Sequence, residues 1–187
     1  MFTVSSGGYE IGVLLDREPE LHGLCRQHAK LIEHFDASTS ESDASSLSFV
    51  SVAHPGEFPF LLVTQRYDSA YSFHPGAILV AETKVLFIGA GTRLLAYDLT
   101  LPKRPWEDTA DFGFHGWRQH GDCILMTAEL EFSAWDLHAK KLWTTFVEPP
   151  WEYAIEAGQV NLDVMGTKVA FNIHTGPTQE QRRLYRG

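Results

Sequence analysis

Basic residues are scarce in this chain. Its 187 residues include 15 lysines and arginines against 24 aspartates and glutamates, giving a formal net charge of −9 at pH 7. Because a nucleic-acid-binding protein needs a basic surface to displace counterions from phosphates, the charge argues against a nucleic-acid partner. The acidic balance is compatible with a basic protein partner, and equally with an acidic surface that only maintains solubility.

Cysteine and long apolar runs are also scarce. The two cysteines, Cys25 and Cys123, lie far apart and show no paired spacing, so a disulfide scaffold is not expected and a reducing compartment fits. Residues 1–8 lack the basic and apolar regions of a secretory signal. No apolar run approaches the roughly 18 residues that span a bilayer. We therefore expect a cytoplasmic protein without a membrane-spanning segment.

Aromatic side chains, by contrast, are plentiful. Hydrophobic residues make up 44% of the chain, and 12 Phe, 6 Tyr and 5 Trp are present. This composition is sufficient for a buried core, and flat rings favour the pleated surface of sheets. The length suits a single domain over residues 1–187.

The N-terminal part predicts a hairpin followed by a helix. Residues 2–15 predict two strands joined at Gly7-Gly8, where glycine accepts the positive φ angles of a tight turn. Residues 18–35 carry apolar side chains at helical spacing and predict the one helix of the chain. Residues 36–46 are acidic and serine-rich without apolar periodicity, which predicts a flexible loop.

From residue 47 onward the pattern is one of short strands separated by turn residues. The strands that we expect are Leu47–Ala53, Phe58–Gln65, Ala77–Ala81, Val85–Gly89, Arg93–Asp98, Ile124–Ala128, Glu131–Asp136, Lys141–Val147, Val160–Val164 and Lys168–Ile173. The segment from His115 to His120 also fits a strand between glycine turns.

A short motif recurs three times within this strand-rich region. Its copies are Ala96-Tyr97-Asp98-Leu99, Ala134-Trp135-Asp136-Leu137 and Ala170-Phe171-Asn172-Ile173, at spacings of 38 and 36 residues. Each copy ends an apolar pair of strands, and a small residue, an aromatic residue and a turn Asp or Asn follow one another. A period near 38 with several strands in each unit predicts four-stranded, blade-like sheets.

These repeats resemble the blades of PQQ-type and WD-like β-propellers over about residues 78–176. The segment that carries the likeness runs from Gly121 through the second motif copy to Trp143, and the third copy keeps a Thr175-Gly176 turn. The resemblance implies a mainly β fold of antiparallel blade-like sheets that form part of a propeller, with one N-terminal hairpin and helix. Closed propellers have about 4–8 blades, and this chain has room for too few, so no quinone cofactor is carried over.

Two acidic and aromatic segments follow the tryptophans of the first two motif copies. The binding residues that they suggest are Trp106, Glu107, Asp108, Asp111, Trp151, Glu152 and Tyr153. We expect both segments on related connecting loops, as a rim of aromatic anchors with acidic steering groups. A pair of catalytic carboxylates, as in glycosidases, is the alternative that their spacing leaves open.

The predicted helix also carries residues of the types that bind metal ions. His22, Cys25, His28 and His34 fall on the predicted helix, but their spacing turns them away from one focus and no further cluster completes a metal site. We expect no cofactor, no metal and no defined catalytic set.

The function that fits best is a non-enzymatic protein-binding domain, in concrete form a bacterial immunity or antitoxin-type protein that neutralises a basic effector. A small hydrolase acting through Asp108, Asp111, Glu152 or His120 is the alternative. A structural subunit that completes a propeller with another chain is the second alternative. A homo-oligomer is also compatible with the sequence.

Overall fold

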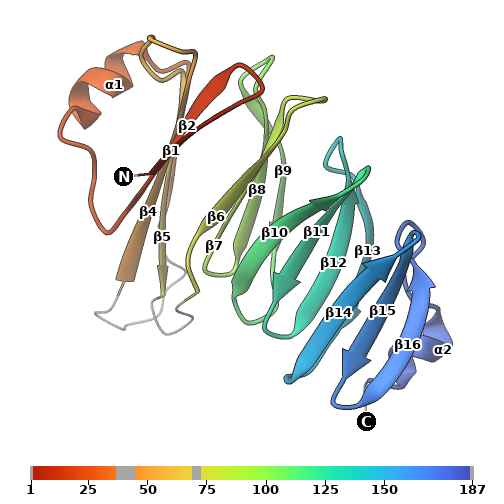
Figure 1. The fold of residues 1–187 in the computed structure, drawn as a ribbon. Helices are drawn as coiled ribbons and strands as arrows, with labels where there is room; N and C mark the ends of the chain where they lie inside the picture. The colour runs from red at the N-terminus through yellow and green to blue at the C-terminus, as the bar shows by residue number, and fades with distance from the viewer. Residues whose placement is uncertain (1, 37–44, 69–72, 186–187) are drawn as a thin grey trace.

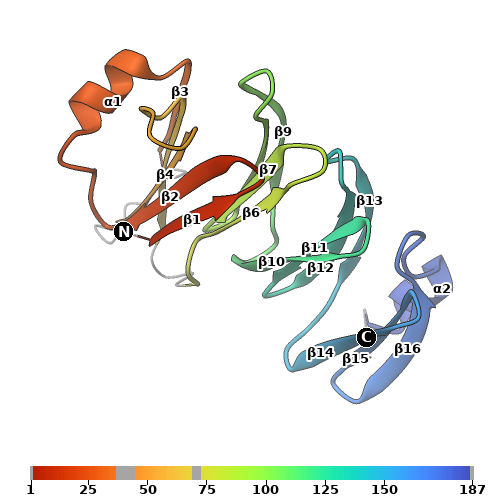
Figure 2. The same ribbon diagram turned by 45° about the horizontal axis from the view of Figure 1, so that its top comes forward.

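The computed structural model describes residues 2–36, 45–68 and 73–185, and within them the chain is mainly β. In these described residues, sixteen strands form four sheets, accompanied by two short helices. The sheets stand side by side in chain order, with the N-terminus at one end of the row and helix α2 at the other (Figure 1). The first and last described sheets lie far apart in both views, so the row is an open stack rather than a ring (Figure 2).

The first sheet has the strand order β1-β2-β4-β5-β3. Its strands are β1 (Phe2–Ser6), β2 (Tyr9–Leu15), β3 (Leu31–Phe35), β4 (Ser45–Ala53) and β5 (Leu61–Asp68). Neighbouring strands are antiparallel except β3, which pairs in parallel with β5. Gly7 and Gly8 have φ angles of +57° and +86°, which confirms the expected glycine turn of the hairpin.

The three following sheets are antiparallel and follow chain order. The second contains β6 (Gly76–Val80), β7 (Val85–Ala90), β8 (Arg93–Asp98) and β9 (Lys103–Thr109). The third contains β10 (Phe114–His120), β11 (Cys123–Ala128), β12 (Glu131–Asp136) and β13 (Lys141–Phe146). The fourth contains β14 (Trp151–Glu156), β15 (Gln159–Val164) and β16 (Thr167–Asn172), and α2 (Gln179–Arg183) follows it. The expected mainly β fold of blade-like sheets is confirmed.

Apolar layers fill the spaces between neighbouring sheets. Val50, Leu86 and Tyr97 belong to the layer between the first two sheets, and Phe87 and Trp135 to the next layer. A third layer lies between the last two sheets and includes Phe132, Trp143 and Leu162. Because each sheet is apolar on the faces that meet a neighbour, the core is divided into slabs along the row.

The outer faces of the first and last sheets differ in what covers them. The outer face of the first sheet is covered by α1 (His22–His28), where Leu14, Phe49 and Leu62 pack against Cys25. The outer face of the last sheet carries exposed polar side chains, among them Glu156, Asn161, Lys168 and Asn172. A polar outer face lets a terminal repeat face water.

The three motif copies occupy the same place in their sheets, on β8, β12 and β16. Their aromatic residues Tyr97, Trp135 and Phe171 are buried. The oxygen Oδ1 of Asp98 accepts a hydrogen bond from the N–H of Thr100 at 2.9 Å, and that of Asp136 accepts from the N–H of His138 at 2.9 Å. The amide oxygen of Asn172 accepts from the N–H of His174, also at 2.9 Å. In all three copies the Asp or Asn thus caps the turn that follows its strand, as expected for a turn residue.

The predicted helix over residues 18–35 is wrong in its second half. Helix α1 is only seven residues long, and Leu31–Phe35 forms strand β3. The chain leaves the helix at Ala29, whose ψ of 136° is extended, and Leu31 then donates its N–H to the carbonyl of Phe60 at 3.0 Å. Parallel pairing with β5 therefore supplies the backbone hydrogen bonds that a longer helix would have supplied.

Two further sequence expectations concern loops. The predicted flexible loop over residues 36–46 lies mostly outside the described residues, and its last two residues begin β4. Two segments expected as connections, Lys103–Thr109 and Trp151–Glu156, are strands β9 and β14. Neither described helix has the length and apolar character needed to cross a bilayer.

Candidate functional site

The predicted binding residues lie mainly on strands, and the structure separates them into two groups. Trp106, Glu107 and Asp108 belong to β9, the last strand of the second sheet. Trp151, Glu152 and Tyr153 belong to β14, the first strand of the fourth sheet, and the third sheet stands between the two groups (Figure 1). The expectation that both segments form one rim of related loops is therefore wrong.

On β9, alternate side chains serve opposite faces of the strand. The ring of Trp106 packs edge-on against Trp135 with centroids 5.3 Å apart, and Asp108 forms an ion pair of 2.7 Å with Lys141. Both contacts reach the third sheet. Glu107 points the other way, because its cross-strand partner Leu95 belongs to the apolar layer against the first sheet. The side chains of β9 therefore connect the second sheet to its neighbours.

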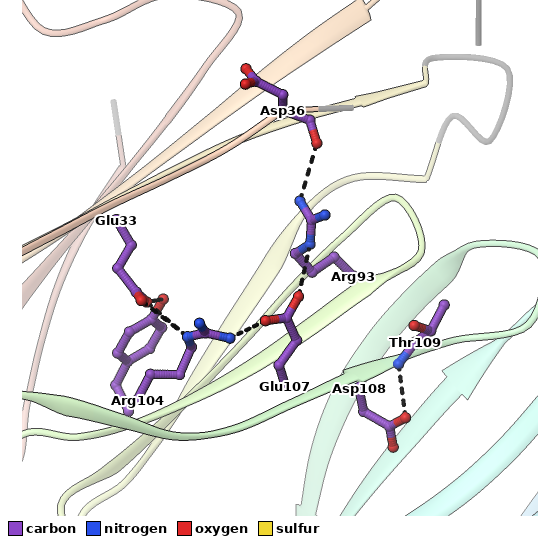
Figure 3. Close-up of polar contacts among 8 residues, drawn as sticks. Glu33, Asp36, Arg93, Arg104, Glu107, Asp108 and Thr109 are labelled. Carbon is purple, nitrogen blue, oxygen red and sulfur yellow. Dashed lines mark hydrogen bonds and ion pairs between the residues drawn. The ribbon is translucent and has the colours of Figure 1, made fainter. Parts of the chain in front are cut away.

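Glu107 is part of an ionic network between the first two sheets, shown in Figure 3. It forms an ion pair with Arg104 and a second, of 3.3 Å, with Arg93. Arg104 also contacts Glu33 of β3 at 3.0 Å. The hydroxyl of Tyr97 donates to the same Glu33 carboxylate at 2.5 Å. With its carboxylate held by two arginines, Glu107 is a structural rather than a free acidic group.

The β14 group lines a groove between the third and fourth sheets. Its lining residues are His115, Thr127, Glu129, Pro149, Pro150, Trp151, Glu152 and Tyr153, and we call it the Trp151 groove. Its volume of about 470 Å³ lies within the range of pockets that hold small molecules or single side chains of a partner. The sequence pointed to three of these residues, whereas Glu129 and Thr127 come from a separate hairpin without a distinguishing motif.

Aromatic packing holds the groove wall in place. The rings of Trp151 and Tyr153 lie 5.5 and 4.6 Å from the ring of Phe132, whose side chain is fully buried. The rings of Trp151 and Tyr153 are also stacked on one another, with centroids 6.2 Å apart. Both side chains are half-buried, so each keeps part of its surface towards solvent.

The charged groups of the groove are only partly satisfied within the chain. The carboxylate of Glu129 pairs with Nε2 of His115 at 3.1 Å, and its side chain remains 37% exposed. Glu152 is exposed at the margin, on the face of β14 opposite to the rings. Burial raises the pKa of the Tyr153 phenol, while the hydrogen-bonded Arg118 acts in the opposite direction. At neutral pH the phenol is therefore uncharged and can donate a hydrogen bond.

Asp111 lies at the end of the third sheet where several connections meet. Leu130 donates its N–H to the carbonyl of Asp111 at 3.3 Å, and Val147 donates to the carbonyl of Leu130 at 3.2 Å. The N–H of Asp111 is bound by the buried carboxylate of Glu131 at 3.1 Å. Asp111 is the one member of the first predicted segment that has an exposed side chain on a connecting loop.

The residues considered for hydrolysis do not form a cluster. Asp108 is paired with Lys141. His120 ends β10 as an exposed residue, and Glu152 lies on the outer face of β14. In the part of the chain that the structure describes, no hydrogen bond or ion pair joins any two of Asp108, Asp111, Glu152 and His120.

The possible metal ligands on the predicted helix are dispersed. His22 pairs with Glu18 at 2.7 Å, His28 stacks on Phe58, and His34 lies on β3 beside Asp36. Over residues 2–36, 45–68 and 73–185, one group of three ligand side chains does converge, namely Asp122, Cys123 and His174. No motif in the sequence points to this group, because Cys123 and His174 are 51 residues apart.

Comparisons with known proteins concern the fold alone. No protein-family model matches the chain, and no curated protein matches it. Among solved structures it is similar to BamB from Moraxella catarrhalis, with 9% identity and a TM-score of 0.40 over 79% of this chain and 49% of that protein. It is also similar to Hsv2 from Kluyvelomyces marxianus, with 11% identity and a TM-score of 0.37 over 76% of this chain and 50% of that one. Both are β-propellers, and this chain spans about half the length of each.

Proposed function

We propose that this chain is a non-enzymatic protein-binding domain and that the Trp151 groove receives a basic side chain of its partner. The observation that carries this proposal is the meeting of two half-buried aromatic rings, Trp151 and Tyr153, with the partly exposed carboxylate of Glu129 in one groove, whose margin also carries the exposed Glu152. The net charge of −9 supports a partner of opposite sign.

This combination of side chains suits a lysine or an arginine. An aromatic face attracts a cation within about 6 Å through its quadrupole, and the apolar stem of a long basic side chain packs against the ring. A carboxylate beside the ring then binds the charged end by a charge-assisted hydrogen bond. Trp and Tyr are also the residue types that contribute most to binding energy at protein interfaces.

In its more specific form the proposal is an immunity or antitoxin-type protein that neutralises a basic effector in the cytoplasm. The acidity of the chain, the carboxylate of Glu129 in the groove and that of Glu152 at its margin support this form. We also propose that the sheets are related to PQQ-type or WD-like blades. The support is the Asp or Asn at the end of β8, β12 and β16, which caps the following turn in each copy.

The test uses charge-neutral variants of equal size. The double variant Glu129→Gln and Glu152→Gln removes two charges at the groove, and the control Glu57→Gln and Glu82→Gln removes two exposed charges elsewhere. The tagged proteins are used to capture partners from the native cell at low and at high salt, and affinity is then measured for the partner found with the unchanged protein. We expect the groove variant to bind at least about tenfold more weakly and the control to bind within about twofold.

If both variants weaken binding equally, the loss reflects the net charge of the protein, and the groove is not the binding site. If the unchanged protein retains no stoichiometric partner at low salt, the binding function itself is contradicted. A screen for hydrolysis of small substrates would then test the alternative function.

A further inference from the structure

Asp122, Cys123 and His174 form a cluster of metal-ligating side chains away from the Trp151 groove. Asp122 lies in the turn before β11, Cys123 is the first residue of β11, and His174 lies in the turn after β16. The cluster therefore bridges the third and fourth sheets. The three ligand atoms, one from each side chain, all lie within 4.8 Å of one another.

The two separations from the sulfur of Cys123 are close to those of a tetrahedral site. The sulfur of Cys123 lies 3.4 Å from Nδ1 of His174 and 3.9 Å from Oδ1 of Asp122. The other ring nitrogen of His174 lies 3.6 Å from the same aspartate oxygen. Zinc bonds of about 2.3 Å to sulfur and about 2.0 Å to nitrogen or oxygen, at tetrahedral angles, place sulfur about 3.5 Å from either partner. An ion can use only one of the two ring nitrogens, and one ligand atom from each of the three side chains lies within 4.8 Å of the others.

A nucleophilic role for the same three residues fits the structure less well. A thiol, an imidazole and a carboxylate in this order also resemble a catalytic relay. Cys123, however, is fully buried, so a substrate cannot reach its sulfur. The side chains of Asp122 and His174 are 72% and 49% exposed, which gives a small ion a route from solvent.

We propose that Asp122, Cys123 and His174 bind a borderline-soft divalent cation, zinc in the first place, with water in the fourth position. One thiolate, one imidazole and one carboxylate are ligands that zinc accepts. On binding, the thiol of Cys123 loses its proton to solvent and the ion takes its place on the sulfur. Because its ligands come from two sheets, the ion fastens the turn after β16 to the start of β11.

The test is a titration of the metal-free, full-length protein with cobalt(II) alone, followed by absorption spectroscopy. We expect one equivalent to bind, with the near-ultraviolet charge-transfer band of a cobalt–thiolate bond and the visible bands of a four-coordinate ion. Zinc(II) should displace the cobalt and raise the melting temperature. His174→Gln and Asp122→Asn alter exposed side chains and should each weaken binding at least about tenfold, with unchanged far-ultraviolet circular dichroism.

The two cysteines provide the matched control. Cys123→Ser should abolish the charge-transfer band, and Cys25→Ser, which changes the half-buried cysteine of α1, should leave it unchanged. The site is refuted if the unchanged protein shows no such band, or if the band depends on Cys25 instead. It is equally refuted if either His174→Gln or Asp122→Asn binds cobalt as tightly as the unchanged protein.

Discussion

The indole N–H of Trp143 donates to the carbonyl of Ile173 at 2.6 Å, which ties the outermost strand of the third sheet to the turn that ends the fourth. Gly176 lies against the same indole, and its lack of a side chain leaves room for the ring. Its φ is +71°, and a Cβ added there would lie 2.6 Å from Cβ of Trp143.

Gly176→Ala should therefore destabilise the protein markedly. The substitution imposes a left-handed conformation on alanine and forces Trp143 away from Ile173, at a combined cost of about 3 kcal/mol. Urea denaturation measures the difference. Gly158→Ala is the control, because Gly158 has a similar φ of +77° but no atom within 4 Å of the added carbon. Equal losses in the two variants would show that the Trp143 contact contributes nothing.

Tyr97→Phe should change how stability depends on alkaline pH. Burial, and next the hydrogen bond to Glu33, raise the pKa of Tyr97 far above its ordinary value. A raised pKa in the folded state means that the stabilisation is complete below about pH 10 and is lost at higher pH, by up to about 1.4 kcal/mol per pH unit. We expect Tyr97→Phe to be less stable at pH 7, because Glu33 loses a partner, and to lose less stability above pH 10.

Tyr185→Phe is the natural comparison. Burial raises the pKa of Tyr185 to about 12, and its hydroxyl has no hydrogen-bond partner among the described residues. This variant should have unchanged or slightly higher stability at neutral pH. Like Tyr97→Phe, it should lose less stability than the unchanged protein between pH 10 and 12. A loss at neutral pH as large as that of Tyr97→Phe would contradict the assignment.

Asp98→Ala should weaken the turn after β8. Hydrogen bonds from Thr100, and then from the Leu101 backbone, lower the pKa of Asp98. A lowered pKa in the folded state gives stability that is present above about pH 4 and lost as the pH falls further. The site is solvent-exposed, so we expect a cost of about 1 kcal/mol at pH 7, shrinking towards pH 2. Asp98→Asn keeps an acceptor and should retain most of the stability.

Glu107→Gln should affect stability and leave partner binding unchanged. The carboxylate of Glu107 is 40% exposed and paired with Arg93 and Arg104, and partly exposed ion pairs contribute about 0–1 kcal/mol. Denaturation at low and high salt should show a small loss that salt reduces. If this variant instead weakens capture of the partner as much as Glu129→Gln with Glu152→Gln, the separation between structural and binding carboxylates is wrong.

The repeat was readable in the sequence because its signal is local. Capping of a turn by Asp or Asn and burial of the preceding aromatic residue depend on neighbours within a few positions, as Asp136 and Trp135 show. Strand β9 was missed because Lys103–Thr109 contains a proline and four charged residues with a single tryptophan. That pattern becomes a strand only through pairing with β8.

Features that depend on contacts between residues far apart in the sequence could not be predicted from it. Leu31 and Phe35 fit a helical stripe as well as the alternation of a strand, and the parallel partner β5, which decides between them, lies about 30 residues further along the chain. Likewise the neighbours of Trp151 in its groove include Glu129 from a different sheet. Spacing along the chain carries no information about such pairs.

The outer faces of the first and last sheets affect how copies of the chain can assemble. A second copy stacked on the last sheet would have to remove Glu156, Asn161 and Lys168 from water without apolar side chains to compensate. A copy added at the other end would have to displace helix α1 from Phe49 and Leu62. Stacking of further copies on either outer face is thus disfavoured.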